Sequence, residues 1–199
     1  MNKPHIKKAT FVKGVVGEEA ILYDGTPQIA FIGRSNVGKS STLNAVLERN
    51  SLVKVGRTPG KTQQINFFDV TTQDNQCFYA VDLPGYGYAK LSKKQRDELD
   101  GLIRWYITHP EADTALICLI IDPKAGPTEL DKEYMKLLNQ HEKNLVILVN
   151  KIDKVNQKGM SAIKKELKAY GIEDRQVIYY SAKTKRYLDK LQSYILQGV

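Results

Sequence analysis

The chain lacks any apolar run approaching the roughly 20 residues that a membrane-spanning helix needs. The basic first eight residues are not followed by the apolar stretch of a secretory signal. Cysteine is scarce: Cys77 and Cys118 are the only two, both lie in strand-like apolar runs, and neither belongs to a pair with metal-ligand spacing. We therefore expect a cytoplasmic protein with two buried, reduced thiols and no disulfide.

Acidic residues are fewer than basic ones, 22 against 30, and the formal net charge is +8. Two interpretations stay open at this point. The lysines are simply solvated, or the protein binds an anionic partner larger than a nucleotide, for which RNA is the natural candidate. The charge gathers in three clusters, at residues 90–96, 151–168 and 183–190.

The chain contains no internal repeat, low-complexity segment or long linker, and apolar runs alternate with helical stretches. This alternation predicts a three-layer α/β/α fold around a mostly parallel six-stranded sheet with one antiparallel edge strand. In such sheets ligands bind beyond the carboxyl ends of the strands. We expect buried strands at 29–32, 78–81, 115–121, 145–149 and 177–180, an edge strand at 64–72 in a hairpin with 78–81, and helices at 39–48, 93–108, 129–140, 158–170 and 188–197.

The string G-R-S-N-V-G-K-S, residues 33–40, follows a predicted strand and opens a predicted helix, which is the context of a phosphate-binding loop. Gly33 and Gly38 allow backbone N–H groups to surround a phosphate at a helix N-terminus. Lys39 supplies a cation for the β- and γ-phosphates, and the Ser40 hydroxyl can bind Mg²⁺. From average residue usage, such a string arises by chance in on the order of one in a hundred chains of this length, so the functional interpretation is favoured.

The string D-L-P-G runs from Asp82 to Gly85 at the end of the predicted strand 78–81. Alone, it is only a turn after a strand. Downstream of a phosphate loop, the Asp82 carboxylate can hold the Mg²⁺ shell through a water, and the Gly85 N–H can meet a γ-phosphate.

Between these strings lies a glycine-rich, basic segment, G-R-T-P-G-K-T-Q at residues 56–63. A segment of this kind can order around a γ-phosphate when one of its threonines closes onto Mg²⁺. Thr58 and Thr62 are both candidates. We favour Thr62, because Thr58 precedes a proline and its backbone is biased towards extended geometry.

Two further strings, N-K-I-D from Asn150 and S-A-K from Ser181, each follow a predicted strand. A carboxylate at Asp153 can accept from both the ring N–H and the exocyclic amine of guanine, whereas adenine would leave a buried carboxylate unpaired. The Lys151 stem can pack over the base, and Asn150 can tie this loop to the phosphate loop. The Ala182 N–H can donate to the exocyclic oxygen of guanine.

The residue after D-L-P-G is Tyr86, where many regulatory GTPases have a glutamine that orients the attacking water. A phenol is a poor substitute for an amide that must both donate and accept, so we expect slow unassisted hydrolysis. A partner could complete the site, or a monovalent cation could supply charge. The side-chain oxygen of Asn36 could help to hold K⁺; a loop-stabilising hydrogen bond is the alternative role.

With G-R-S-N-V-G-K-S-S, T-P-G-K-T-Q, D-L-P-G-Y-G-Y-A and N-K-I-D, the chain resembles the EngB (YihA/YsxC) family of bacterial GTP-binding proteins, in the wider group of TrmE, Era, EngA and septins. The resemblance spans residues 10–197. It implies a Ras-like G domain at 23–199 behind an N-terminal extension at 1–22. It also implies a monomer that binds GTP and GDP with Mg²⁺, hydrolyses GTP slowly, and acts in large ribosomal subunit assembly and in normal cell division and septation.

Matched motif by motif, the resemblance implies three catalytic residues (Lys39, Thr62 and Gly85) and three magnesium residues (Ser40, Thr62 and, through a water, Asp82). The implied nucleotide contacts are Gly33, Arg34, Ser35, Asn36, Val37, Gly38, Lys39, Ser40, Ser41, Gly60, Lys61, Thr62, Gln63, Gln64, Asp82, Leu83, Pro84, Gly85, Asn150, Lys151, Ile152, Asp153, Tyr180, Ser181 and Ala182. The alternative function is a structural, septin-like protein that acts in division without needing hydrolysis. It predicts long interface extensions, for which the tails are too short. A G domain with a membrane or small-molecule task predicts a hydrophobic or second-domain extension.

Overall fold

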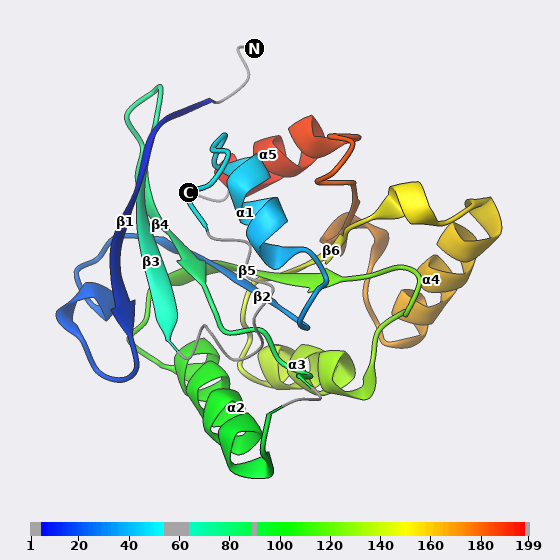
Figure 1. The fold of residues 1–199 in the computed structure, drawn as a ribbon, viewed down its shortest axis with the longest axis horizontal. Helices are drawn as coiled ribbons and strands as arrows, with labels where there is room; N and C mark the ends of the chain where they lie inside the picture. Colours follow the sequence, from blue (N-terminus) through cyan, green and yellow to red (C-terminus); the bar gives the residue numbers. More distant parts are fainter. Residues whose placement is uncertain (1–4, 54–63, 89–90, 198–199) are drawn as a thin grey trace.

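One twisted sheet organises the chain (Figure 1). The computed structural model describes residues 5–53, 64–88 and 91–197. Within these ranges seven strands pair in the order β1-β3-β4-β2-β5-β6-β7. Their bounds are β1 (Ile6–Val15), β2 (Gln28–Gly33), β3 (Ile65–Thr72), β4 (Cys77–Asp82), β5 (Thr114–Ile121), β6 (Leu145–Val149) and β7 (Val177–Tyr179).

Helices cover both faces of the sheet, as the alternating pattern predicts (Figure 1). The helices are α1 (Lys39–Val46), α2 (Lys93–Thr108), α3 (Glu129–Gln140), α4 (Gln157–Ala169) and α5 (Leu188–Leu196), with short 3-10 turns η1 (Ala20–Leu22), η2 (Ile152–Lys154) and η3 (Asp174–Gln176). Two of them begin with a capping box, in which the side chains of Ser92 and Thr128 accept hydrogen bonds from the first turns of α2 and α3.

Each face of the sheet has its own hydrophobic core, because successive residues of a strand point to opposite faces. In β2, Ala30 and Ile32 pack with α2, α3 and α4, whereas Ile29 and Phe31 pack with α1 and α5. Strands β2, β5 and β6 lie in the middle of the sheet and are buried over nearly their whole length. This explains why they appear in the sequence as continuous apolar runs.

The predicted α/β/α fold with a mostly parallel sheet is confirmed, but the sheet has seven strands rather than the predicted six, and the strand predicted at its edge lies one position inside it. β1 pairs antiparallel with β3 from Ile6↔Thr72 to Val15↔Ile65, so β3 lies between β1 and β4 and is antiparallel to both. Two register shifts interrupt β1, and its buried residues are Ile6, Ala9 and Val15. This spacing lacks the period of two by which a strand is detected. The predicted boundary between an N-terminal extension and the G domain, after residue 22, stays a prediction. The segment before it contributes β1 to the sheet.

The expectation of two buried thiols was half correct. Cys118, in the central strand β5, is fully buried, and burial raises the pKa of its thiol. Cys77 is exposed, because it is the first residue of β4 and follows the turn at residues 73–76. Among the helices of the described ranges, none combines the length and the apolar character needed to cross a bilayer.

Candidate nucleotide-binding site

The four strings meet at the carboxyl ends of the parallel strands. β2 ends at Gly33, β4 at Asp82, β6 at Val149 and β7 at Tyr179, and these four strands run parallel to one another. Each string therefore begins where a parallel strand ends, which is the position at which α/β sheets bind their ligands.

The loop from β2 to α1 needs its two glycines for space and for backbone geometry. Gly38 has a φ of +98°, and a Cβ there would lie 2.4 Å from Asn150 Nδ2. A Cβ at Gly33 would lie 2.8 Å from the Ile120 carbonyl oxygen. Gly38 is also the N-cap of α1 and offers no side chain to the first N–H groups of that helix. Backbone donors at a helix start are suited to binding a phosphate.

Lys39 and Asp82 form an ion pair between α1 and the end of β4. The Lys39 Nζ contacts the Asp82 carboxylate, and their side chains are only 10% and 4% exposed. Ser40 follows on α1 and is half-buried. This hydroxyl and carboxylate fit a Mg²⁺ ion that takes its remaining oxygen ligands from phosphate and water. In the described ranges, no group of three or more His, Cys, Asp or Glu side chains is placed to hold a metal ion.

The phosphate loop is joined directly to the D-L-P-G string. The Ser35 N–H donates to the Tyr86 carbonyl at 2.8 Å, and the Tyr86 N–H donates to the Gly33 carbonyl at 3.4 Å. Gly85 is buried against this junction, where a Cβ would lie 3.5 Å from the Ser35 nitrogen. Arg34 extends over the next turn, with its Nε 3.6 Å from where a Cβ of Gly87 would lie.

Asn150 connects three loops through one buried side chain, 2% exposed. Its Nδ2 donates to the Val37 carbonyl in the phosphate loop at 3.0 Å. Its Oδ1 accepts from the Lys151 N–H at 2.8 Å and from the Ala182 N–H at 3.0 Å. The predicted tie to the phosphate loop is confirmed. The Ala182 N–H, expected to face a base, has Asn150 as its partner in this structure.

Lys151 lies across the phosphate loop and is held by a carboxylate that the sequence analysis missed. Its Nζ donates to the Asn36 carbonyl at 2.5 Å and to Asp122 Oδ2 at 2.8 Å. Partial burial is the largest single influence and tends to raise the pKa of Asp122. The hydrogen bonds from Lys151 and from the Lys124 N–H, together with the charges of Lys151 and Lys154, outweigh it, and the pKa is lowered. Asp122 directly follows β5, so its position at a strand end was the available signal. Asn36 has a left-handed backbone, with φ +64°.

The carboxylate proposed to read guanine is exposed and kept ionised by a neighbouring hydroxyl. The Ser181 Oγ donates to Asp153 Oδ1 at 2.6 Å, and this hydrogen bond lowers the pKa of Asp153. The same Oγ accepts from the Thr184 N–H at 3.1 Å. An ionised carboxylate is an acceptor only, which suits two N–H donors on one base edge.

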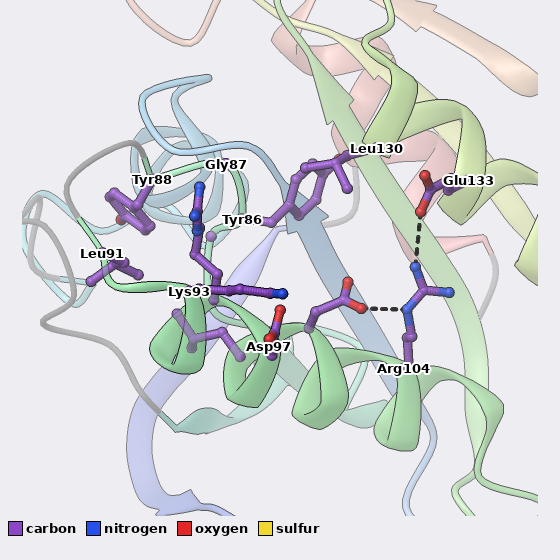
Figure 2. A pocket seen from close by; sticks show the side chains of 13 residues that line it. Tyr86, Gly87, Tyr88, Leu91, Lys93, Asp97, Arg104, Leu130 and Glu133 are labelled. Atoms are coloured by element: carbon purple, nitrogen blue, oxygen red, sulfur yellow. Dashed lines mark hydrogen bonds and ion pairs between the residues drawn. The ribbon is translucent and has the colours of Figure 1, made fainter.

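Tyr86 points away from the phosphate loop and towards α3, as Figure 2 shows. Its hydroxyl donates to the Asp131 carboxylate, and its ring packs on Tyr134 with centroids 4.8 Å apart. Burial, and then the adjacent carboxylate, raise the pKa of Tyr86, so the hydroxyl stays protonated. Asp131 also accepts from the Thr128 N–H and hydroxyl at 2.7 and 2.6 Å. The D-L-P-G turn is therefore fastened to the start of α3.

The remaining predicted residues have different surroundings. Gly60, Lys61, Thr62 and Gln63, and the alternative Thr58, lie outside the described residues. Gln64 donates to Asn66 at 3.0 Å, and Ser41 is exposed on α1. Besides Asp82, Asn150 and Ser181, five more predicted nucleotide residues have buried side chains, which leaves mainly their backbone for a ligand: Val37, Leu83, Pro84, Ile152 and Tyr180. The Tyr180 hydroxyl is hydrogen-bonded to Thr42 at 2.6 Å, which fixes α1 against the end of β7.

Comparison with known proteins gives one consistent result. A family model described as "50S ribosome-binding GTPase" matches residues 28–151, and one described as "Elongation factor Tu GTP binding domain" matches residues 108–199. The chain is 43% identical over 186 residues to "Probable GTP-binding protein EngB" of Mycoplasmopsis synoviae, covering 93% of this chain and 96% of that protein.

Two solved structures are similar in fold, each with a TM-score of 0.71. A probable GTP-binding protein EngB is 24% identical, with 86% of this chain and 97% of that chain covered. Era in complex with MgGDPNP and nucleotides 1506–1542 of 16S ribosomal RNA is 25% identical, with 86% of this chain and 56% of that chain covered.

The Tyr86–Asp131 contact yields a prediction about stability. Replacing Tyr86 by phenylalanine removes a donor from a buried carboxylate, which costs about 1–3 kcal/mol of unfolding free energy. Tyr23→Phe, at an exposed tyrosine, serves as the control and should stay within about 0.5 kcal/mol of the wild type. Urea denaturation followed by circular dichroism measures both variants. Equal stabilities for the two would show that the hydrogen bond does not hold the turn.

Proposed function

Because the chain belongs to the EngB family of GTP-binding proteins, we propose that it acts as a GTP-operated switch in the assembly of the large ribosomal subunit. It is a GTPase, and it binds GTP and GDP. The observation that carries the proposal is the junction at Asn150, where the N-K-I-D loop, the phosphate loop and the loop at Ala182 are fastened together. A single molecule that spans both loops would hold them in place, and its γ-phosphate would be sensed by the turn beside them.

In this proposal, different loops of the chain bind different parts of the nucleotide. Lys39 and the N–H groups of residues 33–41 bind the phosphates, and the Lys39 side chain exchanges its contact with Asp82 for phosphate oxygens. Asp153 accepts from the guanine edge, while the Lys151 stem covers the base. Ser40, Thr62 and, through a water, Asp82 would hold Mg²⁺, which when bound neutralises charge on the phosphates.

Slow hydrolysis follows from the position of Tyr86. Its side chain is committed to Asp131 and Tyr134 on α3, so it does not orient an attacking water. Within the described ranges, the Gly85 N–H and Lys39 are suited to stabilise charge on the γ-phosphate. A target that completes the site, or K⁺ held by the Asn36 side chain, would raise the rate. Hydrolysis would then be timed by the partner.

Three observations support a ribosomal partner. The matching family model is described as ribosome-binding, and Era, a structural relative, is known in complex with 16S ribosomal RNA. The net charge of +8 favours a polyanion. We extend the proposal to a monomer that works in the cytoplasm, where subunits assemble, and that is necessary for normal cell division and septation.

The cation hypothesis gives a kinetic prediction. GTP hydrolysis should be faster in KCl than in NaCl at equal ionic strength, because K⁺ adds charge at the phosphates. Asn36→Gly suits the left-handed backbone at this position and removes the side-chain oxygen, so it should abolish the difference between the two salts. Phosphate release measured in both salts tests this. Equal rates for the wild type would eliminate K⁺ as an activator.

The switch itself predicts nucleotide-dependent docking. In co-sedimentation with large-subunit precursors, protein loaded with a non-hydrolysable GTP analogue should bind more than protein loaded with GDP. Binding should also weaken steeply with salt, because phosphate contacts release counterions. Binding that ignores the nucleotide would contradict a switch. Polymers that form with GTP in the absence of subunits, seen by light scattering, would favour the septin-like alternative instead.

A further inference from the structure

An exposed tyrosine with two cations over its ring lies at the start of α5. Tyr187 is 40% exposed. The Arg186 Cζ lies 5.0 Å from the ring centroid, and the Lys190 Nζ lies 5.2 Å from it. Both cations are themselves exposed. The Arg186 Nη2 also donates to the Tyr187 hydroxyl at 3.5 Å. An aromatic face beside two exposed cations is a combination that proteins use to bind single-stranded nucleic acids, because a base can stack while its phosphates are neutralised.

The loop beneath this ring is firmly built. The Ser181 N–H donates to the Arg186 carbonyl at 3.0 Å, and the Leu188 N–H donates to the Lys185 carbonyl at 3.3 Å. Leu188 and Leu191 are buried in the core under α5. Tyr187 itself has a left-handed backbone, φ 55°, which this loop holds in place. The ring is therefore presented on a rigid support and loses little freedom when it binds a ligand.

The charge around Tyr187 is mostly positive, although Lys183 also interacts electrostatically with Asp153. Residues 183–190 carry four cations against the single carboxylate of Asp189. In the described part of the chain, none of the four has a carboxylate oxygen within 4.0 Å of its nitrogens. On α4, by contrast, Lys164 and Lys168 share Asp174 at 2.9 and 3.5 Å. The four cations are Lys183, Lys185, Arg186 and Lys190.

We propose that Tyr187 and these four cations form a binding site for single-stranded RNA, with one unstacked base on the tyrosine ring. The inference rests on the proposed function, since it identifies where the chain meets its RNA partner. Stacking one base strengthens binding roughly 5- to 150-fold, whereas an exposed cation–π contact contributes about 2- to 5-fold. A base therefore displaces Arg186 or Lys190 from the ring, and the released cation contacts the adjacent phosphate.

A second exposed tyrosine provides an internal contrast. Tyr170 is 46% exposed and has the Lys132 Nζ 4.9 Å from its ring centroid. That lysine is paired with Glu129 at 2.8 Å and lies 3.9 Å from Glu166. These two carboxylates neutralise the lysine and repel phosphates, so this tyrosine is less suited to RNA. Tyr170 therefore serves as a matched control for Tyr187.

The test uses full-length protein and fluorescent single-stranded RNA of about 10 nucleotides, a length within the usual site sizes. In anisotropy titrations, Tyr187→Ala should weaken binding roughly 5- to 150-fold. Tyr187→Phe, which keeps the ring, and Tyr170→Ala should both stay within about twofold of the wild type. GDP affinity, measured for each variant, shows that the protein is folded. Wild-type RNA affinity in Tyr187→Ala would overturn the proposal.

Two further measurements separate stacking from charge. An abasic strand of the same length keeps the phosphates but has no bases, so Tyr187→Ala should leave its binding unchanged. Equal losses on the abasic and the normal strand would overturn the stacking role. Lys190→Gln should lower the slope of log affinity against log salt by about one on either strand. An unchanged slope would overturn the phosphate contact.

The outcomes also separate this inference from the proposed function. Wild-type protein that fails to co-sediment with large-subunit precursors in any nucleotide state contradicts the ribosomal role, but not an RNA site shown by the titrations. Wild-type protein that co-sediments, together with Tyr187→Ala that binds both precursors and RNA normally, contradicts the site and leaves the ribosomal role standing. A loss of both binding activities in Tyr187→Ala supports both statements.

Discussion

The hydrogen bonds of Asn150 are the constraint on which the site depends. One buried amide, at the end of β6, holds the phosphate loop through the Val37 carbonyl and the last loop through the Ala182 N–H. Gly38 allows this contact, since any Cβ there would collide with the amide. Because the Asn150 amide is buried, leaving one of its hydrogen bonds unmade costs more free energy than it would at an exposed site. The three loops therefore keep their positions relative to one another.

Around that node, two ion pairs and one hydrogen bond arrange the charged groups. Asp122 holds Lys151 across the phosphate loop, and Asp82 holds Lys39 at the end of β4. Tyr86 is fastened to Asp131, so the turn after β4 is connected to α3. A γ-phosphate that rearranges this turn would therefore also shift α3. A partner that binds α3 could in this way respond to the nucleotide.

Much of this arrangement could be predicted, since central strands and capped helices carry strong local signals. The bounds of α2, α3 and β6 agree with the predicted ranges. β1 was missed because two register shifts break its period of two. Asp122 and Asp131 were missed because their roles depend on partners far along the chain, Lys151 and Tyr86, which only the folded sheet brings near.

The most direct measurement is the affinity of Asn150→Ala for GDP by isothermal titration. The control is Asn144→Ala, because Asn144 lies just before β6 and bonds the Ala115 carbonyl at 3.0 Å. Losing bonds to two loops, at about 1–3 kcal/mol each, should weaken GDP binding by at least about thirtyfold. The control should bind as the wild type does. Unchanged affinity in Asn150→Ala would contradict the claim that this residue holds the site together.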